Sequence, residues 1–206
     1  MNLFRQLTEK PWVVTDLGED IDLHGRTAFN LPAPQVGLRV FLGAATVLFS
    51  LFIVAYADRM TLGDWRSLPE PWVLWLNTAL LTMSSVALQR ARVAADRGQI
   101  DGVRVGLLAG GSFAFAFLVG QMWAWQQLIA LGYFAGANPA NAFFYVFTAL
   151  HALHLLGGLV AWGRTISKVR RGCEMAEVRM SVELCSVYWH FLLAVWLILF
   201  GMLLFT

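Results

Sequence analysis

Charged residues are scarce in this chain and absent from its longest apolar runs. Only 14% of its 206 residues are Asp, Glu, Lys or Arg and 58% are hydrophobic, whereas about a quarter of a soluble domain is charged. Five runs contain none of the four charged types: 40–57, 71–88, 105–134, 142–163 and 184–205. A helix needs about 20 apolar residues to cross the hydrocarbon core of a bilayer. We therefore expect an all-α integral membrane bundle of five transmembrane helices.

Other absences narrow the function. Without a carboxylate inside the membrane runs, the chain lacks the ionisable relay that a pump or ion-coupled transporter needs. Its two cysteines, Cys173 and Cys185, form no metal-ligand spacing, and we expect no disulfide between them. The net charge of +2 comes with no clustered basic stripe, which argues against nucleic acid as a partner. The six prolines lie outside the helix interiors, with Pro71 at a first helical position.

The loops between the runs indicate the topology. Of the 15 Lys and Arg residues, only Arg59 and Arg66 fall in the segments on one side, and positive loops stay on the cytoplasmic side. We place the N-terminus in the cytoplasm and the C-terminus in the periplasm. Residues 1–37 form a cytoplasmic N-terminal segment without an evident cleaved signal peptide, and residues 38–206 the membrane domain. The segment 164–183 is expected to be the longest loop between helices, and the third run to tilt or protrude into the loop after it.

Three histidines are the ionisable side chains that stand out at membrane depth. His151 and His154 lie three apart on one face of the fourth run, and His190 lies in the fifth. They favour a structural role, either a hydrogen bond between helices or contact with a lipid headgroup. A metal or haem site is the alternative, although two histidines three apart on one helix cannot supply both axial ligands of a haem. An intramembrane serine protease is a third hypothesis, because Ser112 in a GxSx match precedes the helix with His151.

Small and aromatic residues mark helix contacts. Gly110, Gly111, Gly157 and Gly158 predict close helix packing, or alternatively a lipid or partner helix lodged against them. The nine tryptophans fall into two groups. Interface anchors are expected at Trp12, Trp65, Trp72, Trp75 and Trp162. Deeper positions, or positions nearer to a helix contact, are expected for Trp123, Trp125, Trp189 and Trp196.

Several motifs resemble one membrane protein family. The run YWHFLLAVWLILF, residues 188–200, with Glu183 shortly before it, is similar to the last helix of subunit III of the haem-copper terminal oxidases. The fourth run resembles that family's histidine-bearing helix at Phe143, Phe144, Thr148, His151 and His154. Further agreement comes from FLGAATVLFSLFIVAYA, from Gly120-Gln121 with Trp125, and from Ser84-Ser85. The resemblance covers the chain from Val36 onward and fits the bacterial five-helix form.

The chain also departs from that family at three positions. Ala45, Ala124 and Leu193 stand where the family usually has an acidic residue within the membrane. Alanine and leucine cannot exchange a proton, which argues against carrying over a role in the partner's proton uptake. A neutral bundle also costs less to insert, by roughly 2.5 to 3.5 kcal/mol for each buried acid on insertion scales.

The resemblance implies a non-catalytic subunit III of a cytochrome c oxidase in the bacterial inner (plasma) membrane. Such a subunit packs against the catalytic subunit I, holds phospholipid between its helices, and belongs to a complex with subunit II and small subunits. It carries no haem or copper itself; haem and copper belong to subunit I, with copper also on subunit II, and cytochrome c or quinol donates electrons to the complex. Its candidate lipid-binding or structural residues here are His151, His154, His190, Glu183, Trp189, Arg164 and Lys168. A quinol oxidase subunit III and a nitric-oxide-reductase accessory subunit remain alternatives within the family.

Overall fold

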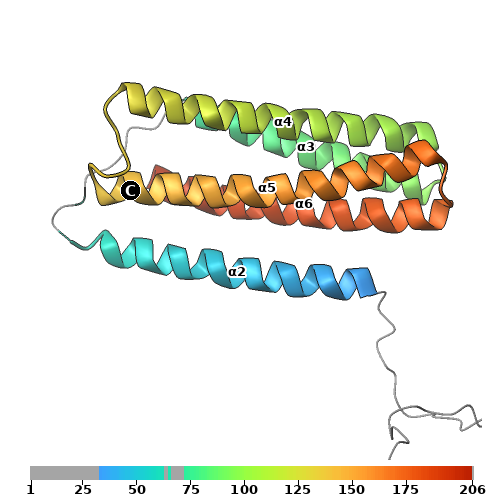
Figure 1. Ribbon diagram of the computed structural model, residues 1–206, viewed down its shortest axis with the longest axis horizontal. Helices are drawn as coiled ribbons and strands as arrows, with labels where there is room; N and C mark the ends of the chain where they lie inside the picture. Colours follow the sequence, from blue (N-terminus) through green and yellow to red (C-terminus); the bar gives the residue numbers. More distant parts are fainter. Residues whose placement is uncertain (1–32, 63–64, 66–71, 206) are drawn as a thin grey trace, which may run out of the picture. The chain divides into compact units, whose positions relative to one another are not determined.

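The computed structural model describes residues 33–62, 65 and 72–205. They contain five helices, labelled as in Figure 1: α2 (Ala33–Arg59), α3 (Val73–Asp96), α4 (Ile100–Ala130), α5 (Pro139–Arg171) and α6 (Met175–Leu204). No strand occurs in this part of the chain, so the all-α prediction is confirmed for it. The expectations for residues 1–32, Trp12 included, and for Arg66 and Pro71 lie outside the described residues.

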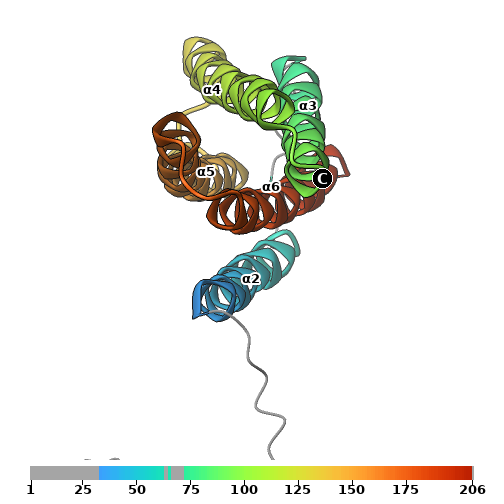
Figure 2. The same ribbon diagram turned by 90° about the vertical axis from the view of Figure 1, so that its right-hand side faces the viewer.

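Four of the helices pack around one another and the fifth lies beside them. Viewed end-on in Figure 2, α3, α4, α5 and α6 form a ring of neighbours, and α2 stands outside it against α5 and α6. Consecutive helices among α3–α6 run antiparallel (Figure 1), as short connections require. One continuous core of large apolar side chains, Phe117, Phe144 and Trp196 among them, fills the ring.

Small residues set how closely the helices approach. A Cβ atom added to Gly106 on α4 would lie 2.7 Å from the Cβ of Ala91, and one on Gly158 of α5 would lie 2.7 Å from a ring carbon of Tyr188. At Gly110 and Gly111 an added Cβ would likewise meet Leu88 and Trp162. The close-packing interpretation is therefore confirmed for Gly110, Gly111 and Gly158. Gly157 differs, because nothing lies within 4 Å of its added Cβ.

The helices extend well beyond the apolar runs on the side where the basic residues lie. The prediction of a long loop over 164–183 is wrong, because α5 continues to Arg171 and α6 begins at Met175. Gly172 closes α5 with φ 67°, a left-handed cap that glycine adopts without strain. Gly98, with φ 72°, sits between α3 and α4. Arg, Lys, Glu and Ala are good helix formers, so the charged ends stay helical once they leave the apolar region.

The opposite ends of the third and fourth runs also differ from the expectation. The third charge-free run spans 105–134, but α4 ends at Ala130 and the chain turns there, with Gly132 at φ 87°. The fourth helix starts earlier than the run, because Asn138 caps it by accepting a hydrogen bond from the backbone N–H of Ala140 at 3.2 Å. Pro139 follows at the first helical position, where its missing N–H costs nothing.

Four of the five described helices are long and apolar enough to cross a membrane, and α3 is the exception. Three of its polar side chains, Asn77, Ser84 and Ser85, are buried against the neighbouring helices. Asn77 donates to the Oε1 atom of Gln121 on α4 at 3.1 Å, and Ser84 donates to the carbonyl of Gly110 at 2.7 Å. Composition alone therefore understates how well α3 fits inside an apolar bundle.

Candidate functional site

A groove between α5 and α6 gathers the two basic residues singled out by sequence. Its volume is about 390 Å³, and Arg164 and Lys168 line it together with the apolar residues Val160, Ala161 and Leu184. Lys168 is held at one end, because its Nζ lies 3.1 Å from the Oγ of Ser181 and 4.0 Å from a carboxylate oxygen of Glu177. Arg164 is exposed and no carboxylate of the described residues lies within ion-pair distance. Gly157 leaves room on the groove wall.

His151 lies at the centre of the bundle, away from lipid and from the groove. It is fully buried, and its ring packs 5.7 Å from Phe117 of α4 and 5.2 Å from Trp196 of α6, measured between centroids. Neither ring nitrogen has a hydrogen-bond partner among the described residues. This histidine therefore joins three helices through ring contacts.

His154 contacts the helix outside the ring. Its centroid lies 5.9 Å from that of Phe41 and 5.3 Å from that of Phe49, both on α2. Its Nδ1 is 2.8 Å from the carbonyl of Leu150 on its own helix, so the hydrogen bond considered between helices is not seen here. His154 instead supplies a flat surface on which α2 packs.

The remaining candidates lie along the contact between α3 and α6. Glu183 accepts a hydrogen bond from Arg92 of α3 at 2.9 Å, forming an ion pair. Trp189 is fully buried and its indole N–H donates to the Oγ of Ser84 at 2.8 Å. His190 is exposed, with its Nδ1 2.6 Å from the carbonyl of Ser186. Glu183 and Trp189 therefore join helices, whereas His190 faces outward.

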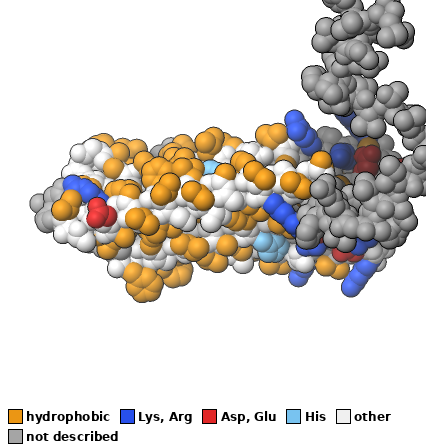
Figure 3. All heavy atoms as spheres, turned by 90° about the horizontal axis from the view of Figure 1, so that it is seen from below, with side chains coloured by type: hydrophobic (Ala, Val, Ile, Leu, Met, Phe, Trp, Pro, Cys, Tyr) orange, Lys and Arg blue, Asp and Glu red, His pale blue; other side chains and the backbone are white. Residues whose placement is uncertain are grey.

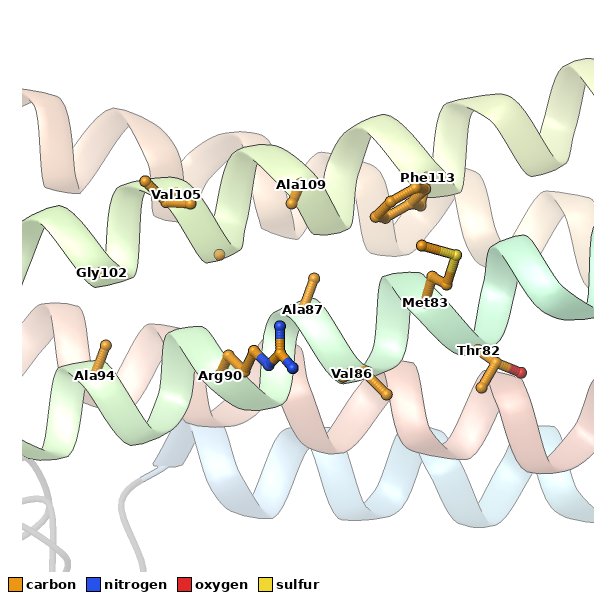
Figure 4. Close-up of a pocket in the computed structure, with 11 residues that line it drawn as sticks. Thr82, Met83, Val86, Ala87, Arg90, Ala94, Gly102, Val105, Ala109 and Phe113 are labelled. Carbon is orange, nitrogen blue, oxygen red and sulfur yellow. The ribbon is translucent and has the colours of Figure 1, made fainter.

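A second groove lies between α3 and α4 and was not anticipated. It has a volume of about 590 Å³, with Met83 and Phe113 at one end and Ala94 and Gly102 at the other. Figure 4 shows the Arg90 side chain extending from α3 toward α4 within it. The sequence signal for this groove is the spacing of the small residues Gly102, Gly106 and Ala109, which line it.

The tryptophans divide differently from the prediction. Trp125, Trp189 and Trp196 donate to side chains on neighbouring helices, so the expectation of helix contacts is confirmed for them. Trp162 was expected to anchor at the membrane interface, but its indole N–H donates to the carbonyl of Leu107 on α4 at 2.8 Å. It therefore ties α5 to α4. The ring centroids of Trp72 and Trp123 lie 5.8 Å apart, and both side chains are exposed.

The three positions that lack an acid are not equivalent. Ala124 is fully buried in the core and Ala45 is 3% exposed on the side of α2 that packs against the bundle, whereas Leu193 is only partly buried. An ionised carboxylate at either alanine would be enclosed by apolar neighbours, which is costly. The neutral side chains suit these surroundings.

The surface charge and the candidate metal and serine sites can be described for residues 33–62, 65 and 72–205. On the face drawn in Figure 3, hydrophobic side chains cover most of the surface and basic side chains gather mainly toward the end where α2 and α6 begin. Residues 33–62, 65 and 72–205 contain no group of three His, Cys, Asp or Glu that could hold a metal ion. Ser112 is exposed, and no hydrogen bond within these ranges joins it to a histidine. The geometry of a serine nucleophile with its base is not present in them.

Comparison with known proteins identifies the family. The family model described as cytochrome c oxidase subunit III matches residues 35–206. A probable cytochrome c oxidase subunit 3 of Nocardia farcinica is 32% identical over 168 residues, covering 77% of this chain and 79% of the relative. The cytochrome c oxidase subunit 3 of Thermostichus vulcanus is 30% identical over 179 residues, covering 82% and 85%. The apolar helices and these relatives indicate a multi-pass membrane protein, and the chain belongs to the cytochrome c oxidase subunit III family.

Proposed function

We propose that this chain is the non-catalytic subunit III of a haem-copper respiratory oxidase of the cytochrome c oxidase type. The family match over residues 35–206 is the observation that carries the proposal. In such a complex the chain packs against subunit I, with subunit II and small subunits as further partners. Haem and copper belong to subunit I, copper also to subunit II, and cytochrome c supplies the electrons. The chain takes part in oxygen reduction and proton translocation only through this complex.

The role of this chain in the complex is structural. The side chains that the family resemblance singled out contact other helices: His151 packs on two rings, Trp189 bonds to Ser84, and Glu183 pairs with Arg92. His151 links α5 to α4 and α6, and the other two contacts link α6 to α3. A rigid bundle of this kind supports stabilisation of a larger partner.

The proposed topology has five spans in a bacterial plasma membrane, with the N-terminus in the cytoplasm. The hydrogen bonds that Asn77 and Ser84 donate to α4 support α3 as the fifth span, since polar groups with partners inside a bundle are tolerated in lipid. The short turn at 97–99 and the one at 172–174 lie at the basic end of the bundle. By the positive-inside rule that end faces the cytoplasm.

Phospholipid binding is proposed for the α5/α6 groove. The groove places Arg164 and Lys168 beside the apolar surface of Val160, Ala161 and Leu184. Basic pockets between transmembrane helices on the cytoplasmic side suit anionic headgroups. The acyl chains follow the apolar wall and the phosphate meets the two cations.

Purification of the tagged chain in mild detergent tests the complex. We expect a many-helix subunit with haem and copper to co-purify, and the separated chain to carry neither. Recovery of the wild-type chain alone, or of haem bound to the separated chain, contradicts the proposal. Mass spectrometry of the companions identifies the electron donor.

The lipid site is tested by lipid retention. Native mass spectrometry of the complex should show loss of bound phospholipid in the Arg164→Gln/Lys168→Gln double variant. Arg90→Gln, in the α3/α4 groove, is the matched control and should keep the lipid. The opposite pattern places the lipid in the α3/α4 groove.

A further inference from the structure

The contact between α3 and α6 is a regular series of polar pairs. As residue numbers rise along α6 they fall along α3, because the two helices run antiparallel. Arg179 pairs with Asp96, with 2.6 Å between Nε and Oδ1, and Glu183 pairs with Arg92 at 2.9 Å. One turn further along, the Oγ of Ser186 donates to the Oε1 of Gln89 at 3.1 Å. We refer to the outer surface formed by Arg92, Glu183, Gln89 and His190 as the α3/α6 seam.

Two side chains of the seam keep unused hydrogen-bonding atoms at the surface. Both Gln89 and His190 are exposed. The Oε1 of Gln89 is taken by Ser186, which leaves its Nε2 as a donor with no hydrogen-bond partner in the described part of the chain. The Nδ1 of His190 must donate to the carbonyl of Ser186, since a carbonyl only accepts. The Nε2 atom of a neutral His190 is then an acceptor that faces outward.

These two groups lie deeper than the charges beside them. Arg92 and Glu183 are both charged and form an ion pair at 2.9 Å, and charged side chains near helix ends suit the boundary between headgroups and hydrocarbon. His190 follows Glu183 by seven residues, which is about 10 Å along a helix. The hydrocarbon at this depth contains no hydrogen-bond partner for a side chain. A polar group without a partner is therefore costly there.

No described helix covers the seam. The remaining helix, α2, packs on the other side of α6. There the ring centroid of Phe41 on α2 lies 5.9 Å from that of His154 on α5 and 5.9 Å from that of Tyr188 on α6. Apolar side chains of α6 flank His190 and are exposed, namely Val187 at 38%, Leu197 at 48% and Ile198 at 56%. A polar centre with an apolar rim is the pattern of a helix-packing surface in lipid.

We propose that the α3/α6 seam is the docking face for a transmembrane helix of another subunit. The partner helix presents a donor, such as a Ser, Thr, Tyr or Trp side chain, to the Nε2 of His190. It also presents an acceptor to the side-chain amide of Gln89. The complementary hydrogen bonds fix the register of the two subunits, while the apolar rim supplies the contact area. This inference rests on the proposed function, since it requires a multi-subunit complex.

The test compares variants in the assembled complex. The catalytic subunit is tagged, and retention of this chain is measured as detergent is increased. His190→Leu and Gln89→Leu should each speed the loss of the chain about threefold to tenfold, the range for one hydrogen bond between membrane helices. The haem spectrum of the remaining core should not change. Val119→Ala on α4, where Val119 is 70% exposed, is the control and should be retained as wild type.

A photoreactive amino acid at position 190 provides an independent measurement. It should crosslink to a subunit with several transmembrane helices, while the same group at position 119 should not. Crosslinks at 190 to lipid alone, or unchanged retention of both leucine variants, overturn the docking face while leaving the proposed function intact. Failure of the wild-type chain to co-purify overturns the proposed function and the docking face together.

Discussion

Helices α2 and α3 reverse the usual relation between composition and burial. The helix α2 is strongly apolar, yet Ala45, Phe49 and Tyr56 are its only buried residues in the described structure. The helix α3 falls below the hydropathy expected of a span, yet buried residues occur along its whole length. In a bilayer, lipid is as apolar as any core, so apolar residues do not mark the interior. Buried polar residues such as Asn77 and Ser84, and small residues, mark it instead.

The two helices are also held by different forces. The contact of α3 with α6 consists of directed pairs such as Trp189 with Ser84 and Arg92 with Glu183. The contact of α2 with the bundle consists of rings, Phe49 on His154 and Tyr56 on Phe147 among them. Directed pairs fix the register and rotation of α3, whereas ring packing constrains α2 less tightly. The predictions below test this difference, from the largest expected effect to the smallest.

A charged side chain in the apolar contact of α2 with the bundle should destabilise the protein. Ala45→Glu places a carboxylate at a site that is 3% exposed against α5 and α6, and we expect a cost of about 2.5 to 3.5 kcal/mol. The yield of membrane-inserted chain at neutral pH measures the effect. Ala45→Gln, similar in size but neutral, is the control and should lose less. Equal yields for the two variants would show that this contact is not apolar.

Close approach of α5 to α6 should depend on one glycine of a pair. Gly158→Leu drives a side chain into Tyr188 and Trp189, and overpacking of this kind costs about 1 to 3 kcal/mol. Gly157→Leu, the adjacent control, meets no atom within 4 Å at Cβ and should leave stability nearly unchanged. Thermal unfolding in detergent distinguishes them. Equal loss in both variants would contradict the packing described.

The directed contacts of α3 should be measurable singly. Trp189→Phe keeps an aromatic ring but removes the hydrogen bond to Ser84 and part of a fully buried side chain. The lost hydrogen bond alone costs about 0.6 to 1.7 kcal/mol. Trp123→Phe changes an exposed indole on α4 and serves as the control. Unfolding by a denaturing detergent measures both. The hypothesis fails if the control is the more damaging change.

The ring contacts of α2 should matter locally. Phe49→Leu removes the aromatic contact with His154, a contribution of about 0.5 to 1.5 kcal/mol. Hydrogen exchange should become faster in the amides of α2 and stay unchanged in those of α3. Faster exchange throughout α3 would mean that α2 is integral to the bundle and not a separate layer.

Sequence reasoning identified the family, the helical class and several interior contacts. The absence of charge from five runs located the helices, and the motif over residues 188–200, with Glu183 before it, gave Trp189 and Glu183 as candidate lipid-binding or structural residues. The pairing of Glu183 with Arg92 could not be predicted, because it joins residues 91 positions apart and depends on the rotation of both helices. The helix ends were misplaced for another reason. Hydropathy predicts which residues lie in the lipid and not where a helix ends. Charged residues such as Lys168 and Glu177 are helical although they lie beyond the apolar runs.

The opposite roles of His151 and His190 could not be predicted either. Both lie in charge-free apolar runs, and neither sequence pattern states which side of the helix meets a neighbour. The structure buries one between Phe117 and Trp196 and exposes the other. The α3/α4 groove could not be predicted from the sequence. Its small residues are equally consistent with two helices that pack closely along their whole contact.

The three-residue turns 97–99 and 172–174 have a practical consequence for the end of the bundle where they lie. Proteases require several residues of extended chain, and these turns expose almost none between capped helices. Intact membranes opened on this side should therefore yield few cuts between residues 73 and 204, even with a trypsin-like enzyme and abundant arginine. A molecule that contacts α3–α6 from this side therefore meets the side chains of helix ends and not a flexible loop.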